Sequence, residues 1–301
     1  MFIDIHVHTR KVPGAPICSG NVYLNGKQPY TTPAQLLERY DGLGIEQAVL
    51  LPGDSPECSW QPQSTEEVLE ICATHPGRFI PFMNVDPRAM TNDWQSDLSG
   101  LMSHYKALGC KGIGEVTANL WFLDPLVQNL FRHAEMLDLP LIFHIGHKFG
   151  GCYGLIDNPG LGQLEESLAR FPKLKFLGHS QAFWAEMAPL RQPSDREGYP
   201  NYPIEAEGAV PRLMRKYQNL YGDLSAGSGC NALKRDPKYA VDFIQEFQDR
   251  LLFGTDICAP DTPTPLVDFL FELRDSGRIT DAIFNKIARS NAIRVLRLEN
   301  C

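Results

Sequence analysis

The chain opens on Phe2-Ile3-Asp4-Ile5-His6-Val7-His8-Thr9, a short apolar run that ends in two histidines. Phe2 to Val7 has the length and the β-favouring residues of a buried strand. Alternate side chains of a strand share a face, so His6 and His8 are expected to point one way and Val7 the other. Two neutral imidazoles on one face suit a borderline metal ion. Taken alone, an HxH pair is more often part of a surface strand, so the rest of the chain has to decide.

Seven similar runs follow, and longer amphipathic segments separate them, which is the pattern of β/α units around a parallel sheet. The predicted strands are Phe2 to Val7, Gln47 to Leu51, Phe79 to Asn84, Gly112 to Val116, Leu139 to Ile145, Leu174 to Gly178, Leu220 to Leu224 and Leu251 to Thr255. The predicted helices are Pro33 to Leu43, Thr65 to Thr74, Trp94 to Leu108, Pro125 to Leu137, Leu161 to Phe171, Tyr239 to Gln248, Pro265 to Asp275 and Asp281 to Leu296. The pattern predicts an α/β fold, a (β/α)8 TIM barrel. An open doubly wound sheet would normally carry a Gly-rich phosphate loop after its first strand, and the sequence has none there.

Size and composition agree with one barrel. The chain has 301 residues and no internal repeat or linker, so we expect a single domain over residues 1–301. A net charge of −8 argues against nucleic acid and anionic membranes as partners. We find neither a signal-peptide pattern nor an apolar run of membrane-spanning length, which predicts a cytoplasmic protein.

Four connecting segments are too long for minimal turns. They are Arg10 to Tyr30, Pro52 to Pro62, Phe149 to Gly160 and Gln181 to Pro203. They follow predicted strands one, two, five and six, so we expect them at the C-terminal mouth of the barrel, where substrate loops lie.

Ionisable side chains recur where the predicted strands end. The six residues are His6, His8, Glu115, His144, His179 and Asp256. One such residue alone is more often a core histidine, a surface glutamate or a turn aspartate. In a barrel, however, the C-terminal strand ends converge on one small area, so we expect these six to become neighbours.

This pattern resembles the amidohydrolase superfamily, in which an HxH pair ends strand one, histidines end strands five and six, and an aspartate ends strand eight. Because the chain begins directly on strand one, it looks like the compact branch that lacks a flanking β-sandwich, often called amidohydrolase 2. Phe253-Gly254-Thr255-Asp256 and Gly178-His179 look most like this branch. It includes aminocarboxymuconate-semialdehyde decarboxylase, γ-resorcylate decarboxylase and 2-pyrone-4,6-dicarboxylate lactonase.

Glu115 points to another part of the superfamily. It fills the strand-four position where binuclear members place a bridging carboxylate, whereas the decarboxylases of the compact branch generally hold a single metal. Gly112-Ile113-Gly114-Glu115 is also similar to the strand-four motif of TatD-like deoxyribonucleases, a phosphodiesterase alternative that the acidic chain disfavours. The resemblance therefore leaves open whether one or two ions are bound.

The resemblance implies a metal-dependent hydrolase. We predict that His6, His8, His144 and Asp256 hold a divalent ion, and that His179 and Glu115 complete a second site. Zinc is the first expectation, and manganese, iron and nickel are the alternatives. A metal-activated water would attack an ester, lactone or amide bond, with Asp256 as general base and then acid, and with His179 polarising the carbonyl or orienting the water. The same ligands would serve non-oxidative decarboxylation, the alternative reaction.

The candidate substrate contacts follow the ligand-bearing strands. They are Arg10, Trp121, Lys148, Tyr153 and Trp184. A cation among them would bind the carboxylate of a small-molecule substrate, although each has a plain alternative as a loop charge or a packed aromatic residue.

Two aspartates and the oligomeric state complete the predictions. Asp223, at the end of strand seven, is expected either to hydrogen-bond a ligand histidine or to serve a turn. Asp4 is expected on the same inward face as His6, as a structural residue of the barrel floor. By analogy with the superfamily, the protein could form a homodimer.

Overall fold

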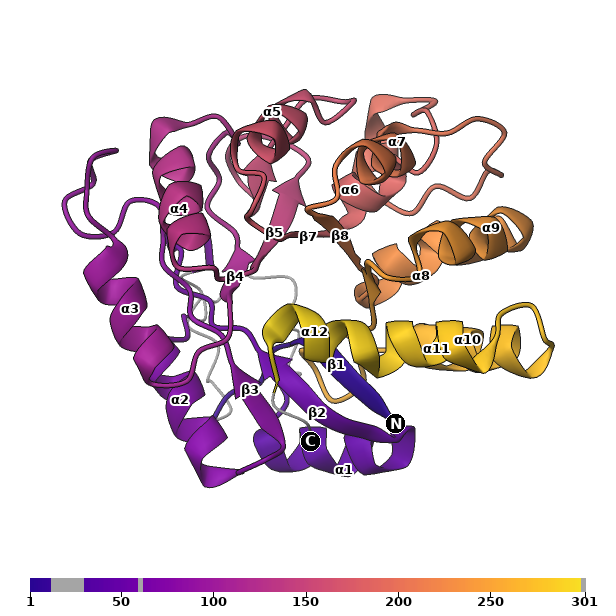
Figure 1. Cartoon of the computed structure of the whole chain (residues 1–301), viewed down its shortest axis with the longest axis horizontal. Coiled ribbons are helices and arrows are strands. Elements are labelled where there is room, and N and C mark those ends of the chain that lie inside the picture. The colour runs from indigo at the N-terminus through magenta and orange to yellow at the C-terminus, as the bar shows by residue number, and fades with distance from the viewer. Residues whose placement is uncertain (12–29, 59–61, 299–301) are drawn as a thin grey trace.

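The computed structural model describes residues 1–11, 30–58 and 62–298, which form a closed (β/α)8 barrel (Figure 1). Its eight strands are β1 (Phe2–Val7), β2 (Ile45–Leu50), β3 (Phe79–Pro81), β4 (Ile113–Val116), β5 (Leu141–Gly146), β7 (Phe176–His179), β8 (Leu220–Asp223) and β9 (Leu251–Leu252). Each overlaps its predicted strand, so the predicted fold class is confirmed. Most of the predicted loop between Arg10 and Tyr30, and residues 59–61 of the next loop, lie outside the described residues.

Helices follow the strands around the barrel. They are α1 (Pro33–Leu43), α2 (Thr65–Thr74), α3 (Ser99–Ala107), α4 (Pro125–Met136), α5 (Gly162–Arg170), α6 (Gln181–Ala185), α7 (Ala209–Lys216), α8 (Ala226–Lys234), α9 (Pro237–Phe247), α10 (Pro265–Asp275), α11 (Asp281–Asn285) and α12 (Asn291–Leu296). Short elements complete the chain: η2 (Pro56–Cys58), β6 (Leu155–Ile156), η3 (Pro193–Glu197) and the π-helical η4 (Lys286–Ser290). No helix in the described ranges is long and apolar enough to cross a membrane.

Local sequence explains both ends of α1, whose bounds agree with the prediction. Thr32 caps α1 by accepting a hydrogen bond from the Gln35 backbone, and Pro33 occupies the first turn. Gly44 ends α1 in the left-handed conformation that glycine adopts without strain. Three helices were not predicted from the sequence: α6, α7 and α8. In α8, two glycines lie in the first turns, and glycine is a weak helix former, so the helical pattern is not evident there.

The barrel closes through two weakly paired seams. Ladder hydrogen bonds join β1, β2 and β3 into one sheet, and β4, β5, β7, β8 and β9 into another. At the β9/β1 seam, pairing reduces to a bridge between Val7 and Ile257, and at the β3/β4 seam to one between Met83 and Ile113. Backbone hydrogen bonds outside the ladders, such as Ile5 N to the Phe253 carbonyl and Gly114 N to the Met83 carbonyl, cross these two joints, and buried polar side chains add to them.

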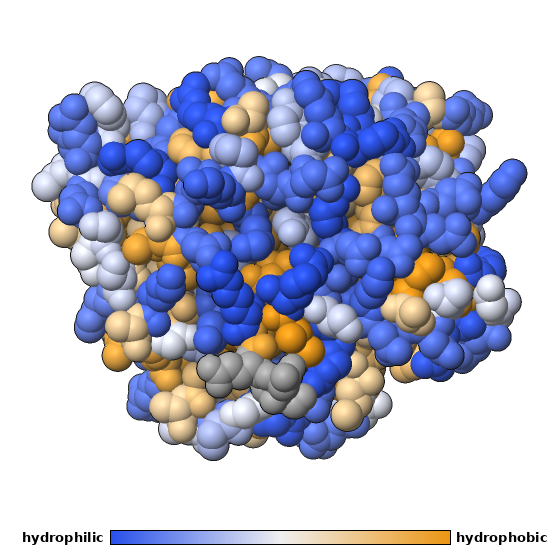
Figure 2. All heavy atoms as spheres, viewed as in Figure 1, coloured by the Kyte–Doolittle hydropathy of each residue, from blue (hydrophilic) through white to orange (hydrophobic). Residues whose placement is uncertain are grey.

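The apolar residues form two layers. Inward side chains such as Ile5, Phe82 and Leu177 fill the barrel together with Val295 and Leu296 of α12. Helix α12 lies across the end of the barrel that faces the viewer in Figure 1, so this end is plugged. The same face in Figure 2 is mostly hydrophilic, with hydrophobic residues showing in small patches between polar side chains. The opposite end, where the strands finish, is left for the functional residues.

Asp4 does not share the inward face of His6, so that prediction is wrong. The register of β1 against β2 shifts between Asp4 and Val7, which breaks the simple alternation of side chains. Asp4 instead accepts hydrogen bonds from the Tyr40 hydroxyl of α1 (2.6 Å) and from the Thr255 backbone nitrogen (2.9 Å).

The segment after β7 is more ordered than the predicted Gln181 to Pro203 loop. It contains α6 and η3, and it buries Glu186. Glu186 Oε2 accepts a hydrogen bond from the Gly160 nitrogen at 2.7 Å, and Oε1 lies 3.7 Å from Arg196 Nε. Burial raises the pKa of Glu186 to about 7, against the opposing effects of Gly160 and Arg196.

The pKa of Glu186 predicts a pH-dependent stability. Below about pH 4.5 the carboxyl is protonated in both states. As the pH rises toward 7 the unfolded chain loses this proton first, so stability falls by at most about 3 kcal/mol. Glu186→Gln keeps an acceptor for Gly160 but cannot ionise. We expect the melting temperature of the variant, relative to the wild type, to rise by a few degrees between about pH 5 and about pH 8. An identical difference at both pH values would contradict this.

Candidate metal centre

Six side chains meet at the open end of the barrel, and three of them form a first donor group: His6, His8 and Asp256. The Nε2 atoms of the two histidines are 3.3 Å apart, and Asp256 Oδ1 lies 3.6 and 3.7 Å from them. Donors bound tetrahedrally to zinc at 2.0–2.1 Å lie about 3.4 Å apart. The first donor group therefore fits a divalent ion with little movement.

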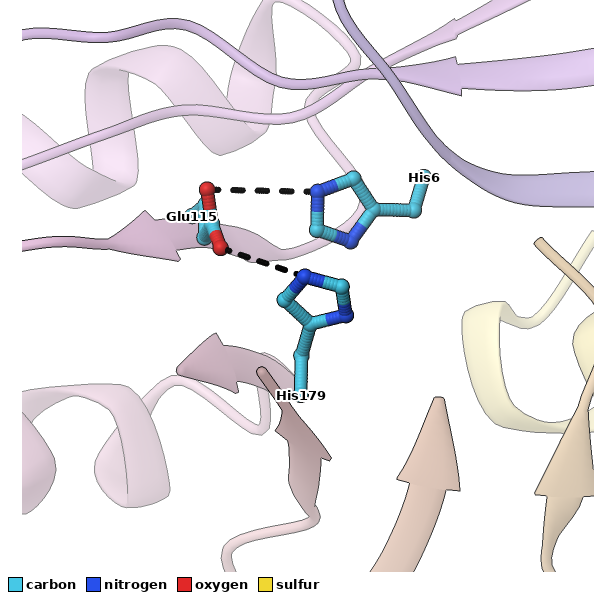
Figure 3. A group of neighbouring side chains, drawn as sticks. All are labelled: His6, Glu115 and His179. Atoms are coloured by element: carbon cyan, nitrogen blue, oxygen red, sulfur yellow. Dashed lines mark ion pairs between the residues drawn. The ribbon is translucent and has the colours of Figure 1, made fainter. Parts of the chain in front are cut away.

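Glu115 joins this group to a second donor group, formed by His6, Glu115 and His179. Glu115 Oε2 lies 3.9 Å from His6 Nε2, and Oε1 lies 3.8 Å from His179 Nε2. Figure 3 shows the carboxylate to one side of the two rings, with one nitrogen of each ring directed at it. Asp256 is shared in the same way, since its Oδ2 is 3.8 Å from His179 Nε2. Glu115 and Asp256 thus each have both carboxylate oxygens close to histidine nitrogens.

His144 lies beside the centre but belongs to neither donor group. Its Nδ1 is 2.7 Å from Glu115 Oε1, and its ring packs against Tyr153 with the centroids 4.7 Å apart. In this arrangement His144 orients the carboxylate of Glu115. Its role as a metal ligand stays a prediction.

Each histidine of the donor groups has a hydrogen-bond partner on its outer nitrogen. His6 Nδ1 is 2.7 Å from Asp223 Oδ2, His8 Nδ1 is 3.1 Å from the Leu51 carbonyl, and His179 Nδ1 is 2.9 Å from Ser225 Oγ. Such partners orient the rings and leave Nε2 for a metal. Of the two roles expected for Asp223, the structure shows the hydrogen bond to a histidine, His6.

Trp184 supports Asp223, one of these outer hydrogen-bond partners, and is not a substrate contact. It is buried, and its Nε1 donates to the Asp223 carbonyl at 2.9 Å. The ring therefore packs in the core beside β8. The sequence could not separate this role from a place at the mouth, because Trp184 follows His179 by only five residues.

The charges of the centre call for a cation. Burial opposes the charged form of His6, but Asp223 and Asp256 outweigh it and raise the pKa of His6 to about 10. Burial lowers the pKa of His179 to about 3, and the charge of His6 acts in the same direction. Burial raises the pKa of Asp256 to about 7. The carboxyl groups of Glu115, Asp223 and Asp256 thus lie close together around the histidines, and a divalent ion among them would balance their negative charge.

A small cavity opens beside the donors. It measures about 120 Å³ and is lined by donor residues and by Arg10, Tyr30, Thr117, Tyr153 and Cys258, among others. Arg10 and Tyr153 therefore lie where the sequence predicted substrate contacts. Tyr30, Thr117 and Cys258 were missed. Cys258 follows Asp256 by two residues, which was an available signal, whereas Tyr30 sits at the end of a long loop that carries no motif.

Two predicted substrate contacts lie elsewhere. Trp121 pairs with Ile156 beside β6, and Lys148 is an exposed loop residue, and neither lines the cavity. A larger groove of about 670 Å³, on the outer side of α4, is lined by Trp94, Arg132 and other residues. It contains none of the donors, so the chemistry, and not the size, identifies the smaller cavity as the site.

Asp223→Asn tests the outer layer. The amide lacks the negative charge that makes His6 a stronger ligand, so we expect zinc affinity to fall about 10- to 100-fold with little change in melting temperature. Competition with a chromophoric chelator measures the affinity. Ser225→Ala is the matched control, because it removes a hydroxyl that contacts His179 but removes no charge, and it should weaken binding less. Unchanged zinc affinity in Asp223→Asn would contradict the role given to this residue.

Comparison with known proteins identifies the family of the chain. A family model described as Amidohydrolase matches residues 3–298. No curated protein sequence gives a significant match. The fold is similar to that of an amidohydrolase from Burkholderia multivorans with bound zinc (14% identity, TM-score 0.64, 99% of this chain and 100% of that chain). It is also similar to a probable 2-pyrone-4,6-dicarboxylic acid hydrolase from Acinetobacter baumannii with citric acid bound (14% identity, TM-score 0.59, 99% of each chain).

A third similar structure is named for a different reaction, decarboxylation. It is 2,6-dihydroxybenzoate decarboxylase from Rhizobium (16% identity, TM-score 0.58, 98% of each chain). At these identities the likeness shows the fold, and the neighbours match the compact branch that the sequence indicated. Since the family model spans nearly the whole chain, the protein belongs to the amidohydrolase family of metal-dependent enzymes.

Proposed function

We propose that this protein hydrolyses an ester, lactone or amide bond in a small, carboxylate-bearing molecule, with zinc as the metal and two ions at full occupancy. The observation that carries the proposal is the position of Glu115. Its two oxygens face different histidines, 3.9 Å from His6 and 3.8 Å from His179. A carboxylate held in this way supports a bridged pair of ions, which is suited to hydrolysis.

The protein's own residues divide the work. His6, His8 and Asp256 would hold one ion, and Glu115 and His179 would hold the other. Bound there, a divalent ion polarises a carbonyl and lowers the pKa of water from about 15.7 toward about 7. Among the centre's carboxylates, Asp256 has the greatest access to the cavity: its side chain is 26% exposed, against 8% for Glu115 and 0% for Asp223.

This difference in exposure supports Asp256 as the general base and acid. It can take a proton from the attacking water and return it to the leaving group. His179 is buried, and its Nε2 lies 3.8 Å from Asp256 Oδ2, so it would orient the groups around that proton transfer.

Arg10 would bind the carboxylate of the substrate. It is 4% exposed, lines the cavity, and stacks over the Tyr30 ring at 4.3 Å. A guanidinium fixed in this way offers paired donors with little loss of conformational entropy. Tyr153, whose ring packs at an angle against His144, would form another wall of the cavity.

Non-oxidative decarboxylation is the second candidate, because the similar Rhizobium structure is a decarboxylase. A single ion on the first donor group would serve it. The carboxylate of Glu115 would then have no metal-binding task, which is why we favour hydrolysis.

A substrate screen tests the proposed function. Lactones, esters and amides that carry a carboxylate, together with hydroxybenzoic acids, are offered to zinc-loaded protein, to chelator-stripped protein and to Asp256→Asn. We expect hydrolysis of a member of the first set by the loaded wild type alone. Asp256→Asn should keep the wild-type fold and lose about 100- to 10,000-fold in kcat. Activity that survives complete metal removal would reject the mechanism. Release of carbon dioxide without hydrolysis would favour the second candidate.

Arg10→Met tests substrate recognition. Losing a charge-assisted contact should raise KM for the carboxylate-bearing substrate about 10- to 100-fold. An analogue that lacks the carboxylate should show the same KM with both proteins. Lys148→Met, which removes an exposed cation outside the cavity, is the matched control and should leave KM unchanged. Equal losses for both substrates would mean that Arg10 acts on the fold.

A further inference from the structure

Asn84 occupies the β3/β4 seam, where the ladder is reduced to a single bridge. It follows β3 at the open end of the barrel and is 2% exposed. Its amide Nδ2 donates to the Glu115 carbonyl at 2.8 Å and to the Pro52 carbonyl at 3.2 Å. Its backbone nitrogen donates to Thr65 Oγ1, in the first turn of α2, at 3.3 Å. One side chain thus ties the ends of β2, β3 and β4 together.

The orientation of this amide is fixed by its surroundings. Both neighbours of Nδ2 are carbonyl oxygens, so turning the amide over would place oxygen against oxygen. An aspartate in this place would bring a charge against the same two carbonyls, and an aliphatic side chain would leave both without this donor. The position therefore requires an amide donor.

The β9/β1 seam has a similar side-chain link. There Asp4 Oδ1 accepts from the backbone nitrogens of His6 (3.0 Å) and Thr255 (2.9 Å). Each seam thus has a link through a buried polar side chain in addition to its backbone hydrogen bonds, and each link reaches a residue of the donor groups or its direct neighbour. At the β3/β4 seam that residue is Glu115.

We propose that Asn84 is a positioning residue for Glu115 and sets how well the second donor group holds its ion. The proposal rests on the proposed function. Glu115 lies near the end of a four-residue strand, and the hydrogen bond to its carbonyl limits rotation of the backbone that carries its side chain. Metal sites require their ligands to be placed within about 0.5 Å. Backbone hydrogen bonds between Met83 and the glycines Gly112 and Gly114 also hold β4 against β3, and the amide of Asn84 extends this set of contacts to Glu115 itself.

A double-mutant cycle in zinc affinity tests the proposal. The proteins are the wild type, Asn84→Ala, Glu115→Gln and the double variant, each titrated with zinc against a chromophoric chelator. The first donor group remains in Glu115→Gln, so binding can be measured in that background. If Asn84 acts through Glu115, Asn84→Ala should weaken binding about 10-fold or more in the wild-type background and less than about 2-fold in the Glu115→Gln background.

Tyr40→Phe is the matched control. It removes one donor to Asp4 at the other seam, so any loss should be the same in both backgrounds. Asn84→Leu, which keeps the approximate size of the side chain without its donor, replaces Asn84→Ala if the latter does not fold. Equal losses for the Asn84 variant in both backgrounds, or no loss in either, would overturn the proposal while leaving the metal enzyme intact. A wild-type protein that binds no zinc would overturn the proposed function and this inference with it.

Discussion

The structure depends on one buried carboxylate at the joint between its first and last strands. Asp4 is fully buried and accepts four hydrogen bonds, from the backbone nitrogens of His6 and Thr255 and from the hydroxyls of Thr255 and Tyr40. These donors offset part of the cost of burying the carboxylate, although burial still raises the pKa of Asp4 to about 6. They also fix His6 relative to Asp256, whose nitrogen donates to the His6 carbonyl at 2.8 Å. The first donor group exists because this joint is closed.

Because the barrel is closed, ionisable residues that are far apart in the sequence interact directly. Asp223 on β8 lies 2.7 Å from His6 and 3.5 Å from His179, so one buried carboxylate serves histidines of both donor groups. Asp256 takes up a left-handed backbone conformation, with φ of 54°, which aspartate tolerates better than most residues. Its carboxylate reaches the donors from that turn. Outer partners and backbone shape thus prepare the site before any ion arrives.

The sequence predicted the barrel and its six ionisable residues because buried parallel strands read as apolar runs, and because function sits where those runs end. Its failures came from tertiary context. Asp4 faces α1 because β1 is irregular, which no alternation rule reveals. Trp184 is buried and donates a hydrogen bond to the Asp223 carbonyl, and Lys148 is exposed to solvent. Both follow ligand-bearing strands as Tyr153 does, so their place in the sequence does not separate them from it. Asn84 carries no motif, and its role is visible only once β2, β3 and β4 stand side by side.

The residues around the metal ligands, which the sequence predicted least well, also bear on which reaction the protein catalyses. The superfamily ligand set serves hydrolysis and decarboxylation alike, so the identity of the ligands does not separate the two. On our proposal, the two reactions differ in whether the carboxylate of Glu115 would help to hold a second ion. The backbone that carries this carboxylate lies at the β3/β4 seam, where the amide of Asn84 adds a hydrogen bond to the Glu115 carbonyl. On our proposal, the chemistry is decided less by the metal ligands than by the residues that hold one strand end in place.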